Sequence, residues 1–162
     1  MKFIEGVATV EDVNAFVTDV GAIADETGAT VQVFDARYVV SEKHLRRAVE
    51  LADRAIERGE NVARDRAVEM LLYAAGRRQI DDALAMGVSE GETPVVALVD
   101  GGDEAKAAAQ LRDLFTERQT LGRYDDERVR DFFDVTDAEL AAADGDLESL
   151  VCERVALLNV EK

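Results

Sequence analysis

The sequence has very little proline, cysteine or histidine and no tryptophan. Its 162 residues include one proline (Pro94), one cysteine (Cys152), one histidine (His44) and no tryptophan. With one proline and no Pro/Gly/Ser-rich tract, the chain has no stretch of linker composition, so we expect a single domain over residues 1–162. A lone cysteine cannot form an internal disulfide, and folding therefore does not depend on crosslinks.

Long apolar runs are also missing. No run approaches the roughly 20 apolar residues that span a bilayer. The first residues, Met1 to Glu5, lack the longer apolar core of a signal peptide. We therefore expect a cytoplasmic protein that does not engage a membrane.

Constellations for catalysis or metal binding are scarce. His44 is the only histidine that could activate a serine or cysteine, and no second His or Cys stands at ligand spacing from it. Because His44 follows Lys43 in a charged segment, we expect it to be solvated. The strand predicted at residues 95–99 precedes Asp100-Gly101-Gly102, but the spacing of a phosphate-binding loop is absent. The sequence predicts no catalytic residue, metal or cofactor.

Positive charge is scarce overall but concentrated in one region. The chain has 35 acidic and 19 basic residues, a formal net charge of −16, and 15 arginines against 4 lysines. This balance favours a salt-loving source, because short screening lengths at high salt tolerate a carboxylate-rich surface. Residues 37–78 carry ten basic and seven acidic side chains, a local net of +3 in a chain whose remainder sums to −19.

Basic residues follow one face of a predicted helix over residues 41–59. Ser41 is the expected N-cap and Gly59 the expected C-terminal glycine. The intervals of four, seven and four residues predict one row of cations, Lys43, Arg47, Arg54 and Arg58. Arginine rows suit phosphates, because each guanidinium offers two parallel N–H donors. Mixed-charge helices that serve only solubility are the alternative explanation.

The apolar pattern predicts a helix-rich α+β fold with a small mixed sheet packed against several helices. Strands are expected at residues 3–7, 30–34, 95–99 and 155–160. Helices are expected near 10–27, 41–59, 65–75, 80–87, 103–118, 126–133 and 137–143, with one more around Leu147 to Val151. The final run, 155–160, could instead extend that last helix; its short, continuous apolar character favours a strand.

Two segments resemble a known family. Gly59-Glu-Asn-Val-Ala-Arg64 followed by Glu69-Met-Leu-Leu-Tyr-Ala-Ala-Gly-Arg-Arg-Gln-Ile80 is similar to the central signature of the small kinase-binding subunit of the KEOPS complex, the TPRKB or PRPK-binding protein type, here in a haloarchaeal-like form. The segments 31–37 and 153–160 also look like the family, so the resemblance covers nearly the whole chain. The acidic loading after Gly87 and the Arg77-Arg78 pair depart from the pattern.

The resemblance implies a noncatalytic partner of an atypical protein kinase/ATPase in the complex that installs threonylcarbamoyl-adenosine on tRNA. It also implies binding of the single-stranded 3′ CCA tail of tRNA and indirect contact with the other KEOPS subunits. A single-stranded tail needs cations for its phosphates and surfaces on which bases stack. The candidate tRNA-binding residues are Arg58, Asn61, Arg64, Tyr73, Arg77, Arg78 and Gln79, with Lys43, Arg47 and Arg54 of the row.

Several alternatives stay open. Tyr73 can equally be a core residue, and Glu69 and Ile80 can equally be scaffold. The C-terminal segment 147–160 has more apolar positions than one helical stripe needs, so Leu150, Leu157 and Val160 are candidate kinase contacts, with core burial as the alternative. A small enzyme that uses carboxylates on a small molecule or nucleotide, and an interaction domain that never meets RNA, are the rival functions.

Overall fold

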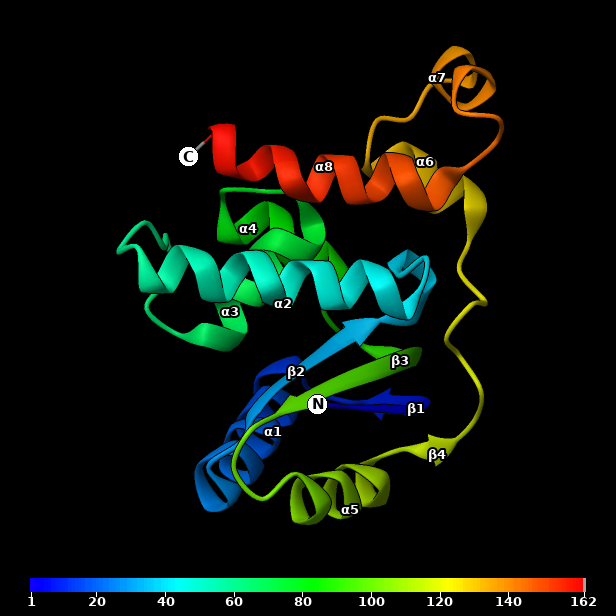
Figure 1. Ribbon diagram of the computed structural model, residues 1–162. Helices are drawn as coiled ribbons and strands as arrows, with labels where there is room; N and C mark the ends of the chain where they lie inside the picture. Colours follow the sequence, from blue (N-terminus) through cyan, green and yellow to red (C-terminus); the bar gives the residue numbers. More distant parts are fainter. Residues whose placement is uncertain (162) are drawn as a thin grey trace.

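A four-stranded antiparallel sheet lies at the centre of the computed structural model, which describes residues 1–161 (Figure 1). Its strands are β1 (Lys2–Val10), β2 (Thr30–Asp35), β3 (Gly91–Asp100) and β4 (Thr116–Glu117), in the order β2-β3-β1-β4. All three pairings are antiparallel. The predicted helix-rich α+β class is confirmed. The expectation of a mixed sheet is wrong.

The position of β3 explains the antiparallel pairing. Strands β1 and β2 run parallel to each other, joined by a helix, but β3 inserts between them and pairs antiparallel with both. Residues 95–99 are fully buried because helices cover both faces of β3. A continuous apolar run predicted this strand, although the structure extends it to Gly91–Asp100.

Helices cover the two faces of the sheet and create two apolar cores. On one face, α1 (Val13–Thr27) and α5 (Glu104–Leu114) bury one cluster of side chains with the sheet. On the other face, α2 (Glu42–Glu57) and α3 (Arg66–Ala75) form an antiparallel hairpin over the second, larger cluster. Helix α8 (Leu147–Glu161) packs across this hairpin as an outer layer (Figure 1).

Short elements complete the chain. The 3₁₀ helix η1 (Ala36–Tyr38) joins β2 to α2, and α4 (Ile80–Ala83) with η2 (Leu84–Met86) joins α3 to β3. Helices α6 (Asp126–Phe132) and α7 (Asp137–Ala142) precede α8. The predicted C-terminal strand at 155–160 is wrong, because α8 continues through it. Val155 and Leu158 face the core one helical turn apart.

Capping residues set the ends of the α2–α3 hairpin. Ser41 accepts a hydrogen bond from the backbone of His44 at the start of α2, and Asp65 accepts from the first turn of α3. Gly76 ends α3 with φ +60°, and a Cβ there would lie 3.1 Å from the carbonyl oxygen of Arg154 in α8. This close approach and the positive φ both favour glycine. The loop before α3 and the turn after it carry most of the predicted tRNA-binding residues.

Candidate nucleic-acid and kinase interfaces

A buried carboxyl group shapes the loop between α2 and α3. Glu69 has no solvent exposure, and its Oε1 accepts hydrogen bonds from the backbone N–H of Val62 at 3.0 Å and of Ala63 at 2.9 Å. Asn61 donates from Nδ2 to the carbonyl oxygen of Ala63 at 2.9 Å. The loop is therefore held from the interior and by its own side chain. Asn61 takes part in this internal bonding, so its amide supports the loop backbone.

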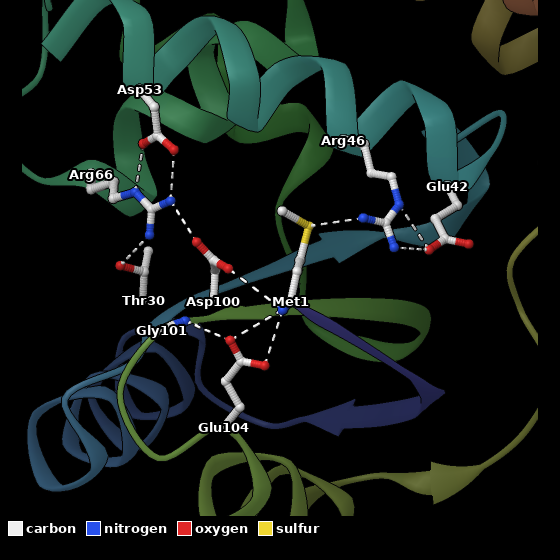
Figure 2. Close-up of polar contacts among 9 residues, drawn as sticks. All are labelled: Met1, Thr30, Glu42, Arg46, Asp53, Arg66, Asp100, Gly101 and Glu104. Atoms are coloured by element: carbon white, nitrogen blue, oxygen red, sulfur yellow. Dashed lines mark hydrogen bonds and ion pairs between the residues drawn. The ribbon is translucent and has the colours of Figure 1, made fainter. Parts of the chain in front are cut away.

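A second cluster of polar contacts fixes the start of α3 (Figure 2). Arg66 donates to both carboxylate oxygens of Asp53 in α2, at 2.7 and 2.9 Å, and to Asp100 at the end of β3 at 2.7 Å. It also donates to the hydroxyl of Thr30 in β2 at 3.0 Å. The hydrogen bond with Asp53 raises the pKa of Arg66 above its ordinary value. This arginine joins α3 to three other elements, and its charge is matched by two carboxylates.

The basic row lies along α2 but is partly neutralised. Glu50 accepts from Arg47 at 2.9 Å and from Arg54 at 3.2 Å, which places both arginines on one face of the helix, as their spacing predicts. Lys43 lies 4.0 Å from Glu148 of α8. Exposed pairs of this kind contribute little stability, yet each carboxylate reduces the attraction that the row exerts on a phosphate.

Two arginines at the loop keep their charge available. Arg58 at the end of α2 and Arg64 in the loop are exposed, and the guanidinium group of neither forms a hydrogen bond or ion pair within residues 1–161. Both flank the segment that Glu69 anchors. Glu57, Glu60 and Asp65 are exposed in the same segment, so this end of the hairpin carries mixed charge in which two cations have no ion-pair partner.

The remaining predicted cations lie at the other end of α3. Ten residues of α-helix span about 15 Å, so Arg77 and Arg78 stand well away from Arg64. Arg77 lies 4.4 Å from the ring centroid of Phe132 and donates to the carbonyl oxygen of that residue. Arg78 and Gln79 are exposed. The predicted residues therefore occupy two separate ends of the hairpin.

A cleft of about 760 Å³ opens beside Arg77. Two guanidinium groups stack on aromatic rings there: Arg77 over Phe132, and Arg128 over Tyr38 at 5.6 Å. Its carboxylates are Asp81, Asp82, Asp125, Glu127 and Asp131. The cleft thus offers flat cations and acceptors for the edges of bases, while its acids repel phosphates. Sequence reasoning missed Tyr38 and Phe132, which are distant along the chain from Arg77.

The structure contradicts the prediction that Tyr73 contacts tRNA. Its side chain has no solvent exposure, and its hydroxyl donates to Oδ1 of Asn159 in α8. A base cannot stack on a ring that neighbouring helices cover. Tyr73 is therefore a core residue that ties α3 to α8, which was the alternative its position allowed.

The prediction that His44 is solvated is also wrong, because its side chain is buried. Its Nδ1 accepts from the backbone N–H of Val40 at 3.3 Å, and its Nε2 lies 2.8 Å from the carbonyl oxygen of Ala74. With Nδ1 accepting, Nε2 carries the proton and donates to Ala74. Burial lowers the pKa of the imidazole from 6.5 to about 4. His44 fixes the start of α2 against the end of α3.

Two exposed apolar residues near the end of α8, Leu157 and Val160, form the apolar stripe of this helix. Leu157 and Val160 are 41% and 80% exposed and lie three residues apart on the side away from the core. Leu150 is only 7% exposed and belongs to the larger core, so its prediction as a partner contact is wrong. The contact between Gly76 and the backbone of Arg154 brings the turn that leads into α4 beside α8.

Two exposed apolar residues of the neighbouring elements were not predicted as contacts. Ile80 in α4 is 44% exposed and Leu84 in η2 is 54% exposed. A four-residue helix followed by a 3₁₀ turn changes the face that each residue presents, so the sequence period alone could not place them.

Neither a metal-binding cluster nor a membrane-spanning helix is found among the described residues. Residues 1–161 contain no group of three or more His, Cys, Asp or Glu side chains that could hold a metal ion. No helix in that part of the chain is both long enough and apolar enough to cross a bilayer.

Comparison with known proteins places the chain in a family. The family described as kinase binding protein CGI-121 matches residues 9–159. No curated protein matches the sequence. The matched range includes α1 to α7, the α2–α3 loop and nearly all of α8. The chain therefore belongs to the CGI-121 family of kinase-binding proteins.

Proposed function

We propose that this protein is a noncatalytic subunit of the KEOPS complex, where it binds the atypical kinase/ATPase subunit and recruits tRNA by its 3′ CCA tail. Its membership of a kinase-binding family over residues 9–159 carries the proposal. A binding subunit needs exposed contact surfaces, and the chain offers apolar ones on α8 and cationic ones around the α2–α3 hairpin.

The α2–α3 loop supports an RNA-binding role. A single strand places its phosphates against cations and its bases against flat or apolar groups. Arg58 and Arg64 provide unpaired cations, and the loop backbone between them is fixed by Glu69. A pre-shaped loop loses little conformational entropy when it binds.

The turn after α3 supplies the second half of the proposed RNA site. Arg78 and Gln79 are exposed beside the cleft in which Arg77 stacks on Phe132. Carboxylates line that cleft, so it fits bases better than phosphates. In this arrangement the tail passes along the hairpin, with its phosphates at the loop end and a base at the cleft.

Reversing the charge at both ends of the hairpin should weaken tRNA binding. We expect Arg64→Glu combined with Arg78→Glu to raise the tRNA dissociation constant about tenfold or more at moderate salt, because phosphate contacts dominate affinity there. Arg112→Glu combined with Arg118→Glu is the matched control, with the same charge change around α5, on the opposite face of the sheet. Fluorescence anisotropy with labelled tRNA measures both.

Removal of the 3′ CCA tail should also weaken binding in the same assay. tRNA without its terminal CCA should bind the unaltered protein about as weakly as intact tRNA binds the double variant. If the control pair weakened binding equally, the interaction would be a non-specific electrostatic attraction. An unchanged dissociation constant in the Arg64 and Arg78 variant would refute the site.

Acidic residues on the apolar stripe of α8 should disrupt kinase binding. We expect Leu157→Glu with Val160→Glu to weaken association with the KEOPS kinase of the same organism about tenfold or more, because apolar contact area is replaced by charges that must be desolvated. Ala105→Glu with Ala109→Glu adds the same charge to an exposed face of α5. Isothermal titration calorimetry at high salt separates the two pairs, and equal affinities would exclude α8 as the kinase contact.

A further inference from the structure

Strand β2 has one unpaired edge. It is the outermost strand of the sheet and pairs with β3 along its whole length, Thr30–Asp35. In an antiparallel edge strand, every second residue directs its N–H and C=O away from the sheet. Apart from the ladder to β3, Nε2 of Gln32 donates to the carbonyl oxygen of Val33 at 3.0 Å, and Asp35 at the end of β2 serves as the N-cap of η1. The exposed part of the strand is its first half, where Thr30 and Gln32 are partly exposed, and the outward backbone groups there have no other partner within the described residues.

This edge forms the floor of a groove of about 710 Å³. One wall is α1, where Phe16 and Val17 face the groove and Val17 is 56% exposed. The other wall is formed by Val68 at the start of α3 and by Val88. Gly21 of α1 leaves open space, since a Cβ there would meet no atom within 4 Å. Two apolar walls therefore flank a row of backbone donors and acceptors.

The charged groups at the rim that have no ion-pair partner are negative, although Asp65 also caps α3. Asp25 and Asp65 line the groove, and neither forms an ion pair with a residue in the described part of the chain. Arg66 also lines it, but two carboxylates already bind this guanidinium (Figure 2). A basic occupant is therefore favoured at this end. A second copy of the chain is disfavoured, because each copy carries a formal net charge of −16.

We propose that the groove binds an extended, basic peptide segment of a partner protein, which adds a strand to the sheet beside β2. Backbone hydrogen bonds to the free edge provide affinity for any extended segment, and the walls select apolar side chains at alternate positions. A lysine or arginine of the segment pairs with Asp25 or Asp65. This surface uses neither Arg64, Arg78 nor the exposed stripe of α8, so it stands apart from the function proposed above.

A synthetic heptapeptide of alternating valine and lysine, blocked at both ends, is the probe. We expect it to bind the full chain and to protect the amides of alternate β2 residues from hydrogen exchange, as followed by ¹⁵N NMR. The same peptide with N-methyl groups on two adjacent central residues cannot present a continuous row of donors on either edge. Its affinity should fall about tenfold or more.

Gly21→Leu tests the location. The leucine side chain fills the open space in the groove, and the substitution favours helix formation, so the variant should fold. Ala22→Leu is the matched control on the exposed neighbouring position. We expect about tenfold weaker peptide binding for Gly21→Leu and no change for Ala22→Leu. Equal binding of the N-methylated peptide, unaltered β2 exchange, indifference to Gly21→Leu, or no binding at millimolar peptide would each overturn the proposal.

Discussion

Replacement of Glu69 by alanine is expected to lower the free energy of unfolding by about 3 kcal/mol. The side chain is fully buried and accepts hydrogen bonds from the backbone of Val62 and Ala63. Its removal leaves these two donors without their acceptor and opens a cavity beneath the loop. Urea denaturation followed by circular dichroism measures the loss.

Glu69→Gln is the matched variant for this experiment. Glutamine has nearly the same volume and keeps a carbonyl oxygen that can accept from the loop, so most of the stability should return. In Glu69→Ala, amide exchange at Val62 and Ala63 should rise more than exchange in the central strand β3. A stability within 0.5 kcal/mol of the unaltered protein, which is the usual range for surface substitutions, would show that the loop does not depend on this carboxyl group.

The same pair of variants links loop shape to RNA binding. If the proposed function is right, Glu69→Ala weakens tRNA binding under conditions where the variant remains folded, although Glu69 itself is buried and cannot touch RNA. Glu69→Gln should bind nearly as well as the unaltered protein. Equal tRNA affinity of the three proteins would show that RNA recognition does not depend on the shape of the loop. The predicted loss of stability would be unaffected.

Acidification from pH 7 to pH 4 should cost about 3 kcal/mol of stability through His44 alone. Burial lowers the pKa of this imidazole to about 4, whereas the unfolded chain has the ordinary value of 6.5. The unfolded state therefore binds a proton more readily in this interval. The contribution of His44 is complete above pH 6.5 and is lost as the pH falls toward 4, because protonation would place an unpaired charge in the core.

His44→Gln isolates this effect from the many carboxylates that titrate in acid. Glutamine can accept from Val40 and donate to Ala74 with its amide group, and it does not titrate. The difference in unfolding free energy between the two proteins should change by about 3 kcal/mol between pH 7 and 4. Parallel stability curves over this interval would contradict a buried, neutral His44 and would favour the solvated position that the sequence suggested.

The distribution of ion pairs refines the role of the basic segment. The sequence concentrates positive charge in residues 37–78, but the fold uses several of these cations internally. Arg66 joins α3 to three other elements, and Glu50 shares its carboxylate between Arg47 and Arg54. The charge that remains for a ligand is concentrated at Arg58 and Arg64. RNA binding should therefore be more sensitive to the loop than to the middle of α2.

Local signals in the sequence were sufficient for most helix boundaries. Ser41 caps α2 and Gly59 follows that helix in the left-handed conformation, as expected; Asp65 likewise caps α3, and Gly28 and Gly76 end α1 and α3. A cap depends on the chemistry of one side chain and the backbone groups within a few residues of it. Such interactions can be read without knowledge of the tertiary structure.

Signals that depend on distant neighbours were less informative. The short apolar run at 155–160 suggested a strand, yet it belongs to α8 because α2 and α3 provide a surface for Val155 and Leu158. The two-residue strand β4 was not predicted at all; it exists only because the edge of β1 pairs with it. The spacing of apolar residues indicates which of them share a buried face, but it does not indicate which element covers that face.

The sequence by itself determined the helix-rich α+β class, the ends of the principal helices and the concentration of arginines in one segment, because these follow from composition, spacing and short-range hydrogen bonds. Only the tertiary structure decided that Tyr73, His44 and Leu150 are buried, that the predicted cations lie at two ends of α3, and that β2 keeps an open edge. Burial and charge pairing arise from contacts between residues far apart in the chain. Their energies depend on what each side chain meets after folding.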